Sequence, residues 1–170
     1  EAGLRTGDIY SPWPEEVNRR ATGALATLHF APTQAAQANL LAENIDPAMI
    51  SVTGNTVIDA LQDAAALLAA DAERTAAFAA HFALDPAKRL ILVTGHRREN
   101  FGGGFERICE SLATLSERDD VEILYPVHLN PNVREPVERL LGGRRTIRLI
   151  APQDYLPFVY LMSQAHIILT

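Results

Sequence analysis

Short apolar runs alternate along the chain with longer segments of helical periodicity. The runs predict strands at 25–31, 50–53, 89–95, 121–127, 146–150 and 167–170, and the longer segments predict helices at 33–43, 105–116, 131–141 and 154–163. Strands separated by helices of about ten residues are the rhythm of a parallel sheet. The sequence therefore predicts the α/β fold class with Rossmann-like parallel sheets.

One alanine-rich segment, 56–82, interrupts the alternation and has strong helix propensity up to Asp85-Pro86. We therefore expect three parts. They are the C-terminal part of an N-terminal α/β domain (1–55), a helical connection (56–86) and the first part of a C-terminal Rossmann-like domain (87–170). Because the pattern opens without a preceding element and stops at a strand end, we expect truncation at both ends.

Polar residues follow directly after the strand predicted at 89–95. The run His96-Arg97-Arg98 lies where this strand should end, and open α/β sheets bind ligands outside the carboxyl ends of their strands. Guanidinium groups pair bidentately with phosphate oxygens. A loop containing Gly102-Gly103-Gly104 leads into the next helix, although loop mobility explains these glycines equally well. The arrangement favours a phosphate-bearing ligand.

The composition of the chain argues against several kinds of binding partner. A net charge of −6 and a pI near 5.3 argue against a general nucleic-acid binder, so a basic site must be local. The single cysteine, Cys109, excludes an internal disulfide framework and fits a reducing compartment. No apolar run approaches the ~18 residues that span a bilayer. We therefore expect a cytoplasmic protein without a nucleic-acid or membrane partner.

Several motifs stand in order along the chain without long gaps. They are Glu1-Ala-Gly-Leu-Arg-Thr-Gly-Asp, Ser11-Pro-Trp-Pro-Glu-Glu-Val-Asn-Arg, Thr53-Gly-Asn-Thr-Val-Ile-Asp, Gly95-His-Arg-Arg-Glu-Asn, Tyr125-Pro-Val-His-Leu-Asn-Pro-Asn-Val-Arg and Pro152-Gln-Asp-Tyr-Leu-Pro-Phe. Together they resemble the non-hydrolysing UDP-N-acetylglucosamine 2-epimerases over essentially the whole chain.

This resemblance implies roughly the middle half of a two-domain enzyme of the glycosyltransferase-B type, whose C-terminal domain binds the nucleotide. It implies interconversion of UDP-N-acetylglucosamine and UDP-N-acetylmannosamine, by elimination of UDP to a glycal and re-addition, in cell-envelope polysaccharide biosynthesis. It further implies a homodimer in the intact protein. We expect no cofactor and assign no metal ligands, and we expect the 170-residue chain by itself to be inactive.

The resemblance places catalytic carboxylates at Glu1 and Glu15 and a catalytic histidine at His96, which contacts the UDP pyrophosphate region. An imidazole there would offset charge on the leaving group. Each residue also has a plain structural interpretation. Glu1 could be a solvated terminal residue, and His96 a strand-end residue bonded to the backbone. Glu15 could belong to a helix start, where proline fits the first turn and acidic residues such as Glu16 face the positive end of the helix dipole.

Substrate-binding positions follow from the same resemblance. Gln153 and Phe158 match positions that read and support the uracil ring, while Arg97 and His128 match the surroundings of a second UDP-N-acetylglucosamine that activates some bacterial members. Phe158 could instead be a core residue of its helix, and one arginine of the 97–98 pair could simply be solvated.

Two other functional classes remain open. A UDP-sugar transferase of the glycosyltransferase-B type would share the domain pattern but should lack the Glu1 and Glu15 motifs. A non-catalytic UDP-sugar binding module would need only His96, Gln153 and Phe158. A hydrolysing epimerase is a nearer relative, which product analysis separates.

Overall fold

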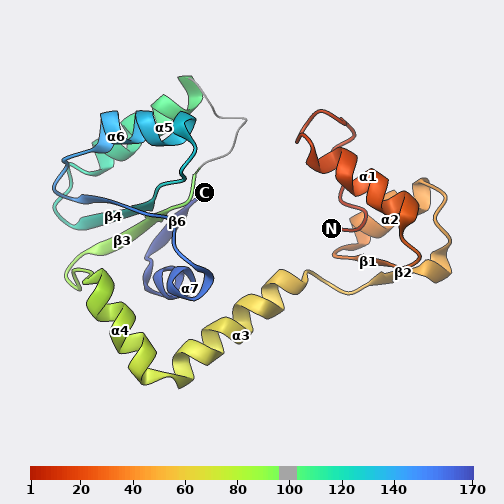
Figure 1. Ribbon diagram of the computed structural model, residues 1–170, viewed down its shortest axis with the longest axis horizontal. Helices are drawn as coiled ribbons and strands as arrows, with labels where there is room; N and C mark the ends of the chain where they lie inside the picture. Colours follow the sequence, from red (N-terminus) through yellow and green to blue (C-terminus); the bar gives the residue numbers. More distant parts are fainter. Residues whose placement is uncertain (96–102) are drawn as a thin grey trace. The chain divides into compact units, whose positions relative to one another are not determined.

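The computed structural model describes residues 1–95 and 103–170 (Figure 1). Backbone contacts divide the chain into two compact units, which we call unit 1 (Glu1–Asp63) and unit 2 (Ala64–Thr170). The division falls inside helix α3 (Thr56–Ala70). The domain boundaries expected after residues 55 and 86 stay predictions.

Unit 1 is built around two short parallel strands. Its elements are α1 (Glu15–Leu25), β1 (His29–Ala31), α2 (Gln34–Ala42), the 3-10 helix η1 (Pro47–Met49) and β2 (Ile50–Val52). His29 pairs with Ile50 and Ala31 with Val52. The core of unit 1 lies between α2 and the two strands and consists of Ala31, Ala36, Leu40 and Ile50. Thr33 caps α2 as predicted, because its hydroxyl accepts a hydrogen bond from the Ala36 amide at 3.1 Å.

Of the strand predicted at 25–31, only the last three residues form a strand in the structure. Leu25 is the last residue of α1, and β1 begins at His29. A short apolar run such as 24–28 fits a helix end as well as a strand, and alanine and leucine both favour the helix. The helix therefore takes Leu25, the first residue of the predicted strand.

Unit 2 contains a four-stranded parallel sheet. After the end of α3, its elements are α4 (Ala72–Phe82), β3 (Arg89–Val93), α5 (Gly103–Leu115), β4 (Val121–Pro126), α6 (Pro131–Leu141), β5 (Ile147–Ile150), α7 (Tyr155–Gln164) and β6 (Ile167–Leu169). The strand order is β5-β4-β3-β6, with every pair parallel. Helices α5 and α6 cover one face and α7 the other (Figure 1). This is the doubly wound arrangement, and it places all carboxyl ends at one edge.

The alanine-rich segment forms two helices because Asp71 starts a new one. The Asp71 carboxylate accepts a hydrogen bond from the Arg74 amide at 2.9 Å and so caps α4. Helix α4 then packs on α7, where the rings of Phe78 and Phe82 lie 5.8 and 6.0 Å from that of Tyr160. The second half of the segment is therefore part of the packing of unit 2.

Helix α5 begins two residues before its predicted start at 105. Gly103 and Gly104 are helical and do not belong to a loop. Gly102 lies outside the described residues. Within residues 1–95 and 103–170, no helix is long and apolar enough to cross a membrane.

Candidate functional site

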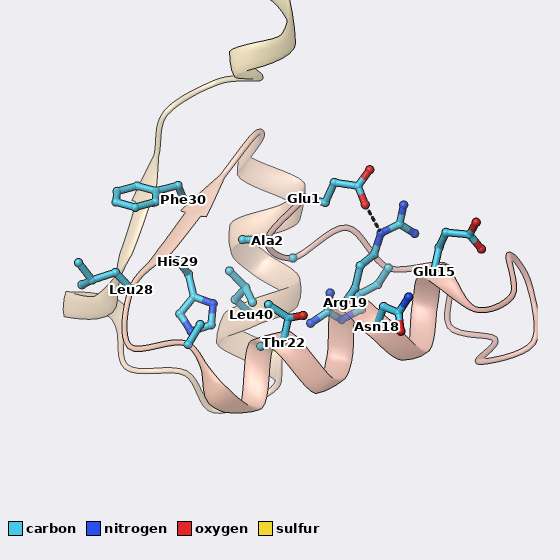
Figure 2. Close-up of a pocket in the computed structure, with 14 residues that line it drawn as sticks. Glu1, Ala2, Glu15, Asn18, Arg19, Thr22, Leu28, His29, Phe30 and Leu40 are labelled. Carbon is cyan, nitrogen blue, oxygen red and sulfur yellow. Dashed lines mark hydrogen bonds and ion pairs between the residues drawn. The ribbon is translucent and has the colours of Figure 1, made fainter.

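A pocket of about 450 Å³ in unit 1 brings together two predicted catalytic residues, Glu1 and Glu15 (Figure 2). We call it the carboxylate pocket. Its polar wall comes from the first residues of the chain and from one side of α1, and its other wall comes from β1 and the segment before it. The lining residues are Glu1, Ala2, Gly3, Arg5, Glu15, Asn18, Arg19, Thr22, Gly23, Ala26, Leu28, His29, Phe30 and Leu40.

Glu1 is held in the pocket by an ion pair. Arg19 Nε donates to Glu1 Oε2 at 2.9 Å, and the Arg19 side chain is only 17% exposed. The hydrogen bond from Arg19 lowers the pKa of Glu1, an effect that partial burial opposes. Glu1 is therefore an ionised carboxylate at neutral pH, which is the state a general base needs. The Glu1 side chain is itself 67% exposed, and its catalytic role stays a prediction.

Glu15 and Glu16 are adjacent but have different surroundings. Glu15 is exposed, is the first residue of α1 and lines the carboxylate pocket. Glu16 is completely buried on another side of the helix. Pro14 occupies the N-cap and makes no side-chain cap hydrogen bond. The first-turn positions of both glutamates fit a helix start, and Glu15 in addition lines the carboxylate pocket.

Further residues of this pocket were not predicted from the sequence. Asn18, Arg19 and Thr22 extend from the same side of α1 as Glu15. They lie three, four and seven residues after Glu15, which is the spacing of one helix face. That signal was present in the sequence. The buried His29 from β1 also lines the pocket, and no local pattern indicated it.

A second pocket, of about 180 Å³, lies in unit 2 at the carboxyl ends of β3, β4 and β5. It brings together three predicted binding residues, His128, Gln153 and Phe158. We call it the strand-end pocket. Its lining residues are Val93, Thr94, Pro126, His128, Pro152, Gln153 and Phe158. Parallel sheets bind ligands at this edge, so the position agrees with the expectation from the sequence.

Local hydrogen bonds orient the polar side chains of the strand-end pocket. Gln153 Nε2 donates to the Ala151 carbonyl at 2.7 Å. His128 Nδ1 accepts from the Asn130 amide at 3.1 Å, which places the proton of the neutral ring on Nε2. Phe158 is half-buried and borders the pocket, while Val159 and Leu161 next to it are fully buried. Phe158 thus lines the pocket while its helix neighbours are in the core, and its binding role stays a prediction.

His96 and Arg97 lie outside the described residues, so their predicted roles remain predictions. The chain leading to them is described up to Gly95, two residues after the end of β3. The Gly95 carbonyl accepts a hydrogen bond from the Tyr125 hydroxyl, whose pKa is raised by burial. Thr94 donates its amide to the Leu169 carbonyl at 2.8 Å. Across the described ranges, no cluster of three or more His, Cys, Asp or Glu side chains could hold a metal ion.

The chain resembles known proteins over its whole length. Residues 1–170 match the family described as UDP-N-acetylglucosamine 2-epimerase. The enzyme of that name from Escherichia coli K12 is 56% identical over the whole chain, which covers 46% of the enzyme. The crystal structure of UDP-GlcNAc 2-epimerase from Neisseria meningitidis bound to UDP-GlcNAc is 47% identical, with a TM-score of 0.93 over 99% of this chain and 46% of that one.

A less similar solved structure has the same fold. The Methanocaldococcus jannaschii UDP-GlcNAc 2-epimerase in complex with UDP-GlcNAc and UDP is 30% identical, with a TM-score of 0.74 over 99% of this chain and 46% of that one. These likenesses confirm the predicted fold class, α/β with Rossmann-like parallel sheets of the glycosyltransferase-B type. The chain spans a little under half the length of these relatives. It belongs to the UDP-N-acetylglucosamine 2-epimerase family.

Proposed function

We propose that the full-length protein containing this chain interconverts UDP-N-acetylglucosamine and UDP-N-acetylmannosamine by inverting carbon 2 of the sugar. Membership of the family supports the proposal. The observation that carries it is the meeting of Glu1, Glu15 and Arg19 in one pocket. Inversion needs acid/base groups near carbon 2, and two carboxylates with a neighbouring cation provide them.

The chemistry divides into two halves. A carboxylate removes the proton from carbon 2 while the bond from carbon 1 to the UDP oxygen breaks, which leaves a glycal and UDP. UDP then re-adds at carbon 1, and a carboxyl group returns a proton to the opposite face of carbon 2. Glu1 suits the role of base because Arg19 keeps it ionised. Glu15, on the first turn of α1, is the second acid/base group.

The strand-end pocket is our proposed nucleotide site. The Gln153 amide can read the uracil edge, and the Phe158 ring can pack against the base. His96 would offset negative charge on the departing UDP. Arg97 and His128 are proposed contacts of a second UDP-N-acetylglucosamine that acts as an activator. The support for these last roles is the resemblance, together with the position of His128 at a strand end.

The alternatives predict a different pocket or different products. A UDP-sugar transferase should lack the Glu1 and Glu15 motifs, and a non-catalytic binding module needs neither carboxylate, so the carboxylate pocket favours the epimerase. A hydrolysing epimerase would keep the same residues, and only its products would differ. It would release free N-acetylmannosamine and UDP.

Proton NMR of the purified full-length protein with UDP-N-acetylglucosamine tests the proposal. We expect an equilibrium mixture of the two UDP-sugars with no net loss of total nucleotide sugar. Accumulation of free N-acetylmannosamine with UDP would assign the hydrolysing reaction. Binding without any turnover would leave a binding module.

We also propose that the protein acts in the cytoplasm, as a homodimer and without a cofactor, in the synthesis of cell-envelope polysaccharide. A free, buried Cys109 as the only cysteine supports a reducing compartment. The homodimer rests on the resemblance alone. Cell fractionation and analytical ultracentrifugation of the full-length protein test these two points.

A further inference from the structure

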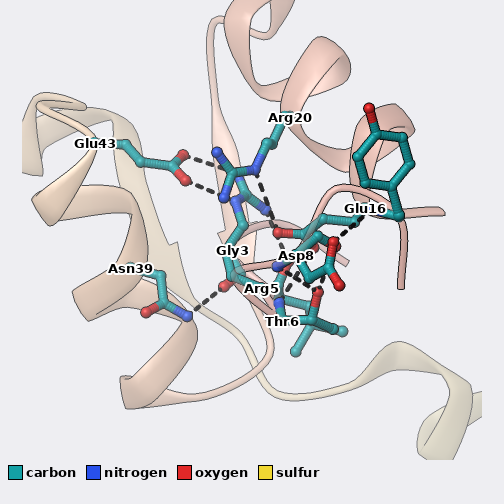
Figure 3. A network of polar contacts seen from close by, with 10 residues as sticks. Gly3, Arg5, Thr6, Asp8, Glu16, Arg20, Asn39 and Glu43 are labelled. Atoms are coloured by element: carbon teal, nitrogen blue, oxygen red, sulfur yellow. Dashed lines mark hydrogen bonds and ion pairs between the residues drawn. The ribbon is translucent and has the colours of Figure 1, made fainter. Parts of the chain in front are cut away.

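Glu16 is a completely buried carboxylate that joins two segments of unit 1 (Figure 3). Its Oε2 accepts a hydrogen bond from the Thr6 amide at 3.3 Å, and its Oε1 accepts one from Arg20 Nε, also at 3.3 Å. Burial by itself would raise the pKa of Glu16, but hydrogen bonds from the Thr6 amide, Arg20 and the Gly7 amide lower it. Glu16 is therefore a buried anion bonded to the backbone of a loop.

The loop in question, residues 1–8, is the segment that carries Glu1, and we call it the Glu1 loop. Two further contacts tie it to α2. Asn39 Nδ2 donates to the Gly3 carbonyl at 2.9 Å. The Arg5 guanidinium, whose side chain is 7% exposed, forms two hydrogen bonds of 2.7 and 2.8 Å with Glu43. Glu16 provides the corresponding tie to α1.

These contacts bear on the proposed catalysis because Glu16 is hydrogen-bonded to the Glu1 loop and is the neighbour of Glu15 on α1. Glu15 precedes Glu16 on α1, and the Thr6 amide of the Glu1 loop donates a hydrogen bond to the Glu16 carboxylate. A shift of Thr6 relative to α1 would change the separation of Glu1 and Glu15 in the carboxylate pocket. Errors of ~1 Å in the placement of catalytic groups can cost ~100-fold in rate.

We propose that Glu16 is a positioning residue of the epimerase reaction and that it sets the placement of Glu1 relative to Glu15. Asn39 contributes a second hydrogen bond that holds the Glu1 loop in place. The inference rests on the proposed function. Neither residue needs to contact the substrate. Their effect is expected in turnover and not in the affinity for UDP, because the proposed nucleotide site is built from unit 2.

The test replaces Glu16 by glutamine in the full-length protein. Glutamine keeps the shape of the side chain and one acceptor oxygen. Its NH2 group, however, would face either the Thr6 amide or Arg20 Nε, and two donors cannot form a hydrogen bond with each other. We expect kcat to fall by about 100-fold, from the cost of ~1 Å of misplacement, while the Kd for UDP stays within about twofold. Titration calorimetry with UDP and an NMR assay of epimerisation give the two quantities.

Glu122→Gln is a matched control. Glu122 is also buried, at 7% exposure, and it also accepts one backbone amide and one arginine, namely Asp85 N at 3.0 Å and Arg148 Nη1 at 2.9 Å. It lies at the start of β4, away from the strand-end pocket. We expect this variant to lower the melting temperature by a similar amount and to keep kcat within about threefold of the wild type.

The outcomes separate the two claims. A wild-type protein without epimerase activity would refute the proposed function, whatever the variants do. With an active wild type, equal kcat losses in Glu16→Gln and Glu122→Gln, or a normal kcat in Glu16→Gln, would overturn the positioning role. If Glu16→Gln does not fold, Asn39→Ala decides. A kcat loss of about tenfold or more with unchanged UDP affinity supports the proposal, and a normal kcat contradicts it.

Discussion

Arg19 Nε lies 2.9 Å from Glu1 Oε2, although 18 residues separate the two in the sequence. The contact joins the Glu1 loop to α1, on the helix face that carries Glu15. The hydrogen bond from Arg19 lowers the pKa of Glu1, and the first prediction follows from this effect.

Arg19→Met should move the acidic limb of the pH profile of kcat/KM to higher pH. Arg19 lowers the pKa of Glu1, so its removal raises that pKa, and the base becomes protonated at a higher pH than in the wild type. Initial rates across pH 4 to 8 measure the shift. Arg145→Met, which removes an exposed ion pair with Asp119 in unit 2, is the control and should leave the limb in place. A limb that stays in place in Arg19→Met would mean that Glu1 is not the titrating base.

Gly3→Ala should destabilise unit 1 more than Gly54→Ala. Both glycines have positive φ, of 77° and 80°, so alanine is strained at either position. A Cβ on Gly3 would also clash with the Ala36 carbonyl oxygen, whereas nothing lies within 4 Å of one on Gly54. We expect a loss of about 1 kcal/mol of unfolding free energy for Gly54→Ala and about 3 kcal/mol for Gly3→Ala. Urea unfolding measures both, and equal losses would contradict the close approach of the Glu1 loop to α2.

Much of the fold follows from local patterns. Helix 131–141 is found at its predicted residues, because Asn130 caps it and Pro131 occupies its first position. Strands β3 and β4 are largely apolar and almost fully buried, as expected for central strands of a parallel sheet, whereas β5 and β6 are more exposed. The start of β1 and the break at Asp71 were not predicted, because apolar and alanine-rich runs do not mark their own ends.

The candidate site was predictable only in part. The resemblance located Glu1, Glu15, His128, Gln153 and Phe158, and each of them lines a pocket. The separate surroundings of Glu15 and Glu16 depend on which helix face packs against the Glu1 loop, and this is tertiary information. The contact between Arg19 and Glu1 has the same origin.

Phe158→Leu should weaken UDP binding. The ring borders the strand-end pocket, and loss of aromatic packing on a base typically costs ~0.5–1.5 kcal/mol, which corresponds to roughly two- to tenfold in Kd. Titration calorimetry with UDP measures the change. Phe78→Leu removes another half-buried aromatic ring of unit 2, one that packs on Tyr160, and it should leave the affinity unchanged. Equal affinities of the two variants would mean that the base binds elsewhere.

His96→Ala should lower turnover by more than it weakens substrate binding. If the imidazole stabilises departing UDP, loss of one such donor typically costs ~100 to 1,000-fold in rate. His96→Asn should keep part of the activity, because an amide still donates one hydrogen bond. Comparison of kcat with the Kd for UDP in both variants checks the role. Near-normal turnover of the alanine variant would make His96 a structural strand-end residue.

Proton exchange at carbon 2 tests the central claim most directly, namely that the carboxylate pocket transfers a proton there. The full-length protein is incubated with UDP-N-acetylglucosamine in deuterated water, and carbon 2 of the product is read by NMR and mass spectrometry. We predict one deuterium at carbon 2 of every UDP-N-acetylmannosamine molecule, and incorporation at least about 100-fold slower in Glu15→Gln, the order expected for loss of a general acid/base group. Product that retains the original hydrogen at carbon 2, or Glu15→Gln that exchanges at the wild-type rate, would contradict the claim.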